Sequence, residues 1–264
     1  MNSMRGARYT RYMQATITAR RLLVGMDDTD NLESRGTGFR AREFGRQLME
    51  EGLAEVRGIS RHQLFVHPDI PYTSHNSALC LDLDWSGGDI VQLIDMARGY
   101  LELTAAPGSD AAFSVVDFDA VADEVVAFGR DAKVKVLTQQ MARELAARHG
   151  IHLEGVTGDH GGIIGSLACA GLRKSGHDGR FVWVKGVRDL DGVTTVAHLL
   201  GQTGIDLLKA NSNATIRDTD RIDVAPWPRP VLLDHKAVLL IEKVEGTNVD
   251  CEWKIVGREG TRHY

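Results

Sequence analysis

Strand-like and helix-like segments alternate along this chain from residue 21 to residue 209. Short runs of apolar or alternating residues predict strands at 21–26, 62–66, 77–83, 113–118 and 180–187. Between them, apolar residues recur with helical periodicity at 37–51, 89–103, 120–128, 138–149, 163–173 and 193–209. Strands alone are predicted near the carboxyl end, at 231–233, 237–244 and 251–256. This order favours an α/β or α+β fold, in which helices pack on a mixed sheet and a small strand-rich C-terminal tail follows.

Domain boundaries are weakly marked in the sequence. The proline-rich stretch PWPRP at 226–230 is the best candidate, so we expect a main domain at 21–225 and a small β-rich appendage at 226–264. Residues 1–20 contain several arginines, and no acidic residue precedes Asp27, so we expect a flexible basic arm there. A targeting peptide, a nucleic-acid-binding arm, or an early start codon with Met13 as the true start would explain the same residues.

Composition excludes several classes of protein. The chain has 264 residues, of which 43% are hydrophobic and 25% charged, as in an ordinary soluble globular protein. No apolar run reaches the roughly 18 residues that a membrane span needs, so no membrane partner is expected. The three cysteines form no Cys-x-x-Cys pair, which argues against a zinc ribbon or a disulfide framework and favours a cytoplasmic location.

The charge balance bears on nucleic-acid binding. The chain has 31 Lys and Arg against 36 Asp and Glu, a net charge of −5. A nucleic-acid binder normally has a basic surplus, because neutralising phosphates supplies much of its affinity. We therefore do not expect the isolated chain to bind tRNA tightly.

An acidic cluster, Asp27, Asp28 and Asp30, follows the first predicted strand. Three carboxylates within four residues repel one another unless a cation lies among them. Oxygen ligands of this kind suit Mg²⁺, which usually takes one or two carboxylates and completes its shell with water and substrate phosphates. The alternative is a turn that ends a strand and exposes its charges to solvent.

Two loops that precede predicted helices are candidates for phosphate binding. The glycine-rich segment at 158–166 contains Gly161, Gly162, Gly165 and Ser166, and its amides could approach an anion at the start of a helix. It matches no Walker A pattern, and its small residues would equally let the helix lie close to a sheet. The second loop contains Gly36 and Thr37; Thr37 is a good N-cap, and this helix start is also near enough to the aspartates to receive a phosphate.

Asn76 is the last candidate, either as the cap of a turn or as a hydrogen-bonding partner of a substrate. The sequence has no Gly-x-Ser-x-Gly elbow and no evident Cys/His pair for nucleophilic catalysis.

Several of these motifs together resemble the agmatinylcytidine synthetase family, which modifies an isoleucine tRNA. The resemblance rests on VGMDDTD at 24–30, PDIPY at 68–72, NSA at 76–78 and GGIIGSLA at 161–168, in the family's order and with similar spacing. WPRPVLL at 227–233 is similar to a further segment of the family. The resemblance is firm over about residues 22–82 and 155–172.

The resemblance implies a kinase-like region in which aspartates hold magnesium and ATP. In the family, ATP phosphorylates the cytidine carbonyl oxygen, and agmatine then displaces the phosphate. By matching motif, Asp27, Asp28 and Asp30 would hold metal and phosphates; Gly161, Gly162 and Gly165 would lie against the nucleotide; and Asn76 would line the pocket.

The sequence also departs from the family. The family's Lys-Thr-Arg-Gly-Asn becomes Thr73-Ser74-His75-Asn76, one residue shorter and without the lysine or arginine. Its Cys-Thr-Thr becomes Gly36-Thr37-Gly38. We also expect the family's oligonucleotide-binding fold and zinc ribbon to be missing.

Residues and resemblance together predict a Mg²⁺–ATP-dependent phosphotransferase, either a kinase or a kinase-ligase. Its acceptor would be a small molecule or a nucleotide. Two alternatives stay open: a non-catalytic nucleotide-sensing module, and a tRNA-modifying subunit that needs a partner for RNA binding.

Overall fold

A computed structural model describes residues 19–71, 75–212, 214–245, 250–257, 259–261 and 264 of the chain. The basic arm expected at 1–20 lies outside the described residues up to residue 18. The first lobe contains β1 (Arg20–Asp27), α1 (Thr37–Glu50), β2 (Ala54–Gln63), β3 (Ser77–Trp85), α2 (Ile90–Thr104), β4 (Ala112–Asp117), a 3-10 turn (Phe118–Ala120), α3 (Asp123–Asp131), α4 (Gln139–Arg148), β5 (His152–Gly155) and α5 (Ile163–Ser175). The second lobe contains β6 (Arg180–Trp183), β7 (Val193–Thr195), α6 (Val196–Gln202), β8 (Leu207–Ala210), β9 (Arg221–Asp223), β10 (Val231–Leu233), β11 (Lys236–Lys243) and β12 (Trp253–Ile255).

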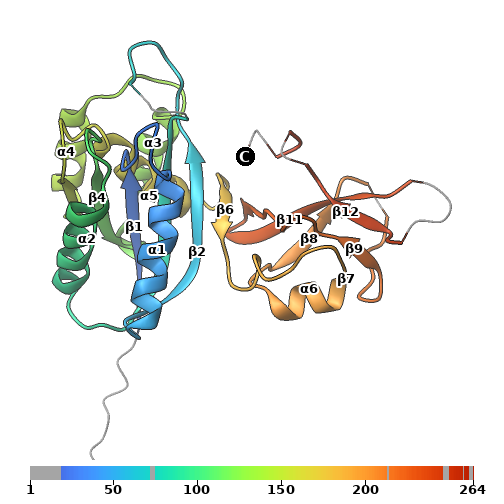
Figure 1. Ribbon diagram of the computed structural model, residues 1–264. Coiled ribbons are helices and arrows are strands. Elements are labelled where there is room, and N and C mark those ends of the chain that lie inside the picture. The colour runs from blue at the N-terminus through green and yellow to red at the C-terminus, as the bar shows by residue number, and fades with distance from the viewer. Residues whose placement is uncertain (1–18, 72–74, 213, 246–249, 258, 262–263) are drawn as a thin grey trace, which may run out of the picture.

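The first lobe is a three-layer sandwich (Figure 1). Its antiparallel strands lie in the order β5-β4-β1-β3-β2, with β1 in the middle. The succession β1-α1-β2-β3-α2-β4 and this strand order are those of a βαββαβ unit. Helices α1 and α2 cover one face of the sheet, and α3, α4 and α5 cover the other.

Alternation along β1 explains why both faces are covered. Leu22, Val24 and Met26 are fully buried and pack under α1 and α2, whereas Leu23 points to the side of α5. Helix α1 presents Ala41, Phe44 and Leu48 to the same core, at the spacing of one helical face. A strand buried on both faces reads as a continuous apolar run, which is why β1 was predictable from sequence.

Glycines let α5 lie unusually close to β1 and α3. A Cβ on Gly25 of β1 would overlap the carbonyl oxygen of Ser166 in α5. A Cβ on Gly171 would likewise overlap the carbonyl oxygen of Val125 in α3. The small residues of α5 therefore serve close packing, which was one of the two readings of that segment.

The second lobe continues the same sheet through β6, which pairs with β2 and, at one position, with β10. A separate hydrophobic cluster holds this lobe together; it includes Phe181, Leu199, Leu239 and Trp253. Most pairs are antiparallel, but β8 runs parallel to β11 and β9 parallel to β12. The expected mixed α/β fold with C-terminal strands is therefore confirmed.

Several element boundaries differ from the sequence expectations. Strand β2 begins at Ala54 rather than at residue 62. The sequence did not predict this start, because exposed charged residues interrupt the apolar pattern; one of them, Arg57, pairs with Asp84 on β3 at 3.0 Å. The segment 193–209, expected to be helical, forms β7, α6 and β8, whose strands pair with distant segments. The third cluster includes residues from both sides of position 226, so we propose that the lobes divide near residue 180.

The described part of the chain contains no helix that is both long enough and apolar enough to cross a membrane.

Candidate functional site

The ends of four strands meet where β1 stops at Asp27. Because the sheet is antiparallel, the carboxyl ends of β1 and β2 lie beside the starts of β3 and β4; Met26 pairs with Leu79, and Asp27 with Ala112. Helix α5 starts at the same place, since the amide of Gly162 donates to the carbonyl oxygen of Asp110 at 3.0 Å. The βαββαβ arrangement thus gathers loops that are far apart in sequence into one site.

Asp27 lies at the bottom of this site, against Gly165. A Cβ on residue 165 would overlap the Asp27 carboxylate, so only glycine leaves room for it. Burial, and then the neighbouring charge of Asp28, raise the pKa of Asp27 to about 8. A buried carboxyl of this kind binds either a proton or a cation near neutral pH.

Asp28 lies near the carboxylate of Asp110, a residue that no sequence motif indicated. Burial raises the pKa of Asp28 to about 6, and the charges of Asp110 and Asp30 add to this effect. Asp28 also has a positive φ of 52°, which is uncommon for a residue other than glycine. The approach of the two carboxylates is visible at Gly161, where an added Cβ would lie 3.3 Å from Oδ2 of Asp28 and 3.4 Å from Cβ of Asp110. Asp110 precedes β4 without any motif around it, so only the pairing of β1 with β4 reveals its place.

Asp30 has a local structural partner. Its Oδ1 accepts hydrogen bonds from the amide of Thr37 at 3.3 Å and from the Thr37 hydroxyl at 2.8 Å. The expectation that Thr37 is the N-cap of α1 was therefore wrong. Gly36 is the N-cap and its position supplies no side-chain bond, so Asp30 caps the helix from outside.

The glycine-rich segment contributes fewer residues to the site than expected. Gly161 and Gly165 line the pocket, but Gly162 and Ser166 do not. A Cβ on Gly162 would lie 2.6 Å from the Asp27 carbonyl oxygen, and Ser166 is fully buried with its hydroxyl bonded to Ile163. The amides of Asp159 and Gly162 already donate to Asp110, so these amides are not available to an anion.

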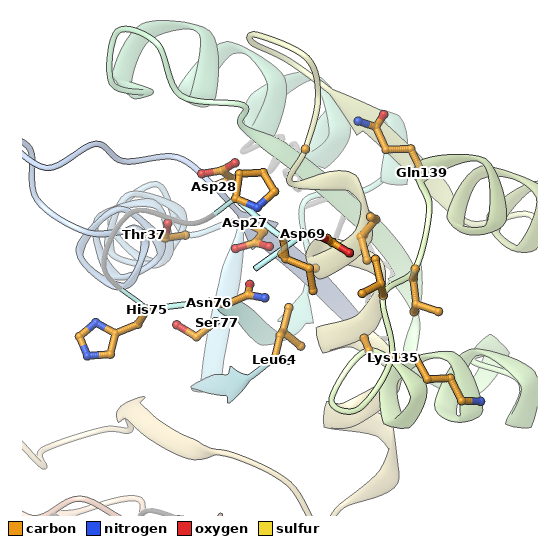
Figure 2. A pocket seen from close by; sticks show the side chains of 18 of the residues that line it. Asp27, Asp28, Thr37, Leu64, Asp69, His75, Asn76, Ser77, Lys135 and Gln139 are labelled. Carbon is orange, nitrogen blue, oxygen red and sulfur yellow. The ribbon is translucent and has the colours of Figure 1, made fainter. Parts of the chain in front are cut away.

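Together these residues form a pocket with an acidic end and an apolar wall (Figure 2). Asp27, Asp28, Asp30 and Thr37 lie at one end, and the wall consists of Leu64, Ile70, Pro71, Ala132, Val136, Leu137 and Ile164. Asn76 lines the pocket and holds its rim, since Nδ2 donates to the carbonyl oxygen of Phe65 at 2.6 Å. Lys135 and Gln139 line the opposite side and were not anticipated from sequence.

A second, basic pocket adjoins the first. Arg35, Arg42 and Arg61 line it together with the start of α1, and we call it the arginine pocket. It shares Asp30, Thr37, His75 and Ser77 with the acidic pocket. Gly36, a candidate from the sequence, lies here and not in the acidic pocket.

The acidic pocket is better suited to a magnesium ion that enters bound to a nucleotide than to an ion that the protein holds permanently. Within the described ranges, no group of three or more His, Cys, Asp or Glu side chains is placed to hold a metal. All three aspartates line the pocket, but Oδ1 of Asp30 already accepts two hydrogen bonds from Thr37, so Asp27 and Asp28 are the better candidate ligands. Two carboxylates are the usual protein share of a Mg²⁺ shell that phosphates and water complete.

A Ser-His-Asp arrangement also occurs in the chain, but it is buried. The Ser60 hydroxyl lies 2.7 Å from Nε2 of His62, whose Nδ1 lies 2.9 Å from Asp178. Both Ser60 and His62 have no exposed surface, so a substrate cannot reach this serine. The network is structural and does not provide a nucleophile.

The chain was compared with known protein families, curated proteins and solved structures. No family model and no curated protein matches the chain. Among solved structures, the complex of TiaS with an isoleucine tRNA and ATP is 26% identical, with a TM-score of 0.51, over 58% of this chain and 36% of that one. A tRNA fluorescent labelling enzyme is also 26% identical, with a TM-score of 0.51, over 57% of this chain and 36% of that one.

The matched chains are much longer than the matched region, which spans little more than a third of their length. TiaS is described as the agmatidine synthetase of an isoleucine tRNA, which is the family that the sequence motifs resemble. This chain therefore contains a region similar to part of agmatidine synthetase.

Proposed function

We propose that this chain is an ATP-using enzyme that binds Mg²⁺–ATP in the acidic pocket. The observation that carries the proposal is the pairing of Asp27 and Asp28 with an apolar wall in one pocket. The apolar wall suits a nucleobase, and the two carboxylates suit the magnesium ion that accompanies the phosphates. TiaS, to which the region is similar, has been solved in complex with ATP.

The reaction that this site supports best is phosphoryl transfer, by a kinase or a kinase-ligase. Such chemistry needs positioning and charge neutralisation more than a protein nucleophile. A magnesium ion held by Asp27 and Asp28 would neutralise phosphate charge next to Thr37. Lys135, whose exposed ammonium pairs with Asp131 at 2.8 Å, adds a positive charge on the opposite side of the pocket.

A tRNA-modifying role is the second candidate, because the matching structure of TiaS is a complex with an isoleucine tRNA. The comparisons give no support to the expectation of weak tRNA binding by the isolated chain, so that expectation stays a prediction. A tRNA-modifying role would need RNA-binding elements beyond the acidic pocket, either elsewhere in this chain or from a partner.

Calorimetry with MgATP tests the proposal. Asp27→Asn and Asp28→Asn should each weaken MgATP binding by about 1–3 kcal/mol, the range for contacts to charged groups. Asp218→Asn is the matched control, because Asp218 is an exposed aspartate of the second lobe. Unchanged affinity in both pocket variants would refute the site. ATP turnover in the wild-type protein then separates an enzyme from a nucleotide sensor.

A further inference from the structure

Two arginines of the arginine pocket, Arg35 and Arg42, form no salt bridge with a carboxylate among the described residues. Arg42 donates to the carbonyl oxygen of Gly38 at 2.9 Å, and the Arg35 guanidinium lies 4.3 Å from the ring centre of Phe39. The acidic neighbours are Asp30, which lines the pocket and binds Thr37, and Glu43, whose charge acts on the half-buried Arg42 without a direct ion pair.

The second lobe adds a further arginine to this cluster. Both Nε and Nη2 of Arg188 donate to the carbonyl oxygen of Val182, at 3.4 and 3.3 Å, and Val182 lines the arginine pocket. The Arg188 guanidinium also stacks over Trp227, 5.1 Å from the ring centre. Burial and the nearby charge of Arg188 lower the pKa of Arg42; the charge of Glu43 opposes this effect, and that of Arg35 adds to it. Like charges from both lobes thus converge on one opening.

The start of α1 adds a smaller positive potential to that of the arginines. The first turn of a helix carries partial positive charge, and Gly36, Thr37 and Gly38 all line the pocket. However, Asp30 already accepts a hydrogen bond from the amide of Thr37, so its negative charge offsets part of this potential. The arginines are therefore the main source of positive potential.

We propose that the arginine pocket binds a phosphate group carried by the acceptor substrate. This inference rests on the proposed function, because it assigns the acidic pocket to the nucleotide. The two pockets share Thr37 and Ser77, so an acceptor anchored through its phosphate would lie next to the end of the nucleotide. Arginine suits the role because its planar group of donors matches phosphate oxygens.

The phosphate could belong to a small phosphate ester or to an RNA backbone, since both present the same oxygens. A small ester would fill the pocket alone, whereas RNA would also reach Arg188 and Trp227 at the lobe junction. Stacked aromatic and arginine side chains add affinity for single-stranded bases. The experiment therefore needs one probe for each source.

The test measures binding of inorganic phosphate, and of a short single-stranded RNA, to the full chain in the presence of a non-hydrolysable MgATP analogue. Arg35→Gln and Arg42→Gln should each weaken phosphate binding by about tenfold or more. Arg42→Lys keeps the charge but loses the planar group of donors, so its affinity for phosphate should lie between those of wild type and Arg42→Gln. Arg46→Gln is the matched control, because Arg46 lies on the same helix but is exposed and pairs with Glu43 and Glu50.

Three results would overturn the proposal or separate it from the proposed function. If phosphate binds equally well to wild type and to both glutamine variants, the pocket is not an anion site. If both variants lose MgATP affinity in parallel with phosphate, the pocket holds the phosphates of the nucleotide itself. If wild type binds phosphate through Arg35 and Arg42 but does not bind MgATP, the proposed function fails while the anion site stands.

The RNA probe identifies the source of the phosphate. RNA binding that exceeds phosphate binding, and that falls in both glutamine variants and in Arg188→Gln, supports an RNA acceptor. Phosphate binding without any gain for RNA supports a small phosphate ester.

Discussion

At the scale of single residues, the site depends on contacts that no sequence motif specifies. Asp27 and Asp28 were predictable from their crowding, but their roles differ from that of Asp30, which caps α1 through Thr37. Asp110 raises the pKa of Asp28, yet nothing in its sequence context marks it. Gly162 and Ser166 matched the family motif, and the structure places both in the packing between α5 and β1 rather than in the pocket. The motifs thus predicted which segments approach the pocket, but only three-dimensional contacts show which of their residues line it and which pack beneath it.

Gly165→Ala should damage both stability and nucleotide binding. The new Cβ would overlap the Asp27 carboxylate and lie 3.1 Å from Leu64, so one of these side chains must shift. Overpacking of this kind destabilises by about 1–3 kcal/mol. Urea unfolding and MgATP calorimetry measure the two effects.

Gly99→Ala is the control for this substitution, because nothing lies within 4 Å of a Cβ at that exposed position of α2. An alanine there should leave binding unchanged and stabilise the helix by about 0.5–1 kcal/mol. If Gly165→Ala behaves like Gly99→Ala, Asp27 does not occupy the place that the structure assigns to it.

At the scale of elements, apolar periodicity predicted most helices of the first lobe. It did not predict segments whose conformation depends on pairing with a distant strand. Helices α1, α2, α4 and α5 lie close to their expected ranges because each has a clear apolar face. Strand β2 was largely missed, and β7 and β8 were taken as helical, because their conformation depends on partners in β3, β9 and β11. Local sequence does not record such long-range pairs.

A buried polar network fastens β2 to the connection between α5 and β6. His62 bonds to Ser60 and Asp178, and Lys133 also pairs with Asp178. Burial lowers the pKa of His62, although the bond to Asp178 opposes this effect. The pKa of Asp178 also lies below its usual value, because His62 and Lys133 outweigh the effect of burial. The network therefore lies directly before β6, where the second lobe begins.

The network predicts that stability falls on acidification. Below about pH 6.5 the unfolded chain protonates His62, whereas the folded chain keeps it neutral to a lower pH. The free energy of unfolding should therefore decrease as pH falls from about 7 to 5. Protonation of Asp178 at lower pH should extend the loss. Urea unfolding at several pH values should show a smaller decrease in His62→Asn over the first window. Identical slopes in wild type and His62→Asn would show that this histidine titrates normally in the fold.

At the scale of the whole molecule, charge is distributed unevenly. The chain is acidic overall, with a net charge of −5, yet several of its arginines lie together at the arginine pocket and beside it. The sequence predicted the net charge but not the cluster of arginines, because Arg35 and Arg42 approach Arg188 only through the pairing of β2 with β6. A local basic surface can orient an anionic substrate without giving high overall affinity for nucleic acid.

We therefore expect the chain to bind total tRNA only weakly, with a dissociation constant above about 1 µM at about 150 mM salt. Fluorescence anisotropy with labelled tRNA measures this affinity directly. Sub-micromolar binding that persists after removal of residues 1–20 would contradict the expectation and would favour the tRNA-modifying role.

The central claim is that the acidic pocket holds Mg²⁺–ATP through Asp27 and Asp28. A crystal structure of the chain with Mn²⁺ and a non-hydrolysable ATP analogue tests it most directly, because Mn²⁺ replaces Mg²⁺ and its anomalous signal locates the ion. We predict one metal peak between these two carboxylates and the phosphates, with the base against the apolar wall and the last phosphate next to Thr37. A nucleotide bound elsewhere, or a metal that contacts neither aspartate, would contradict the account.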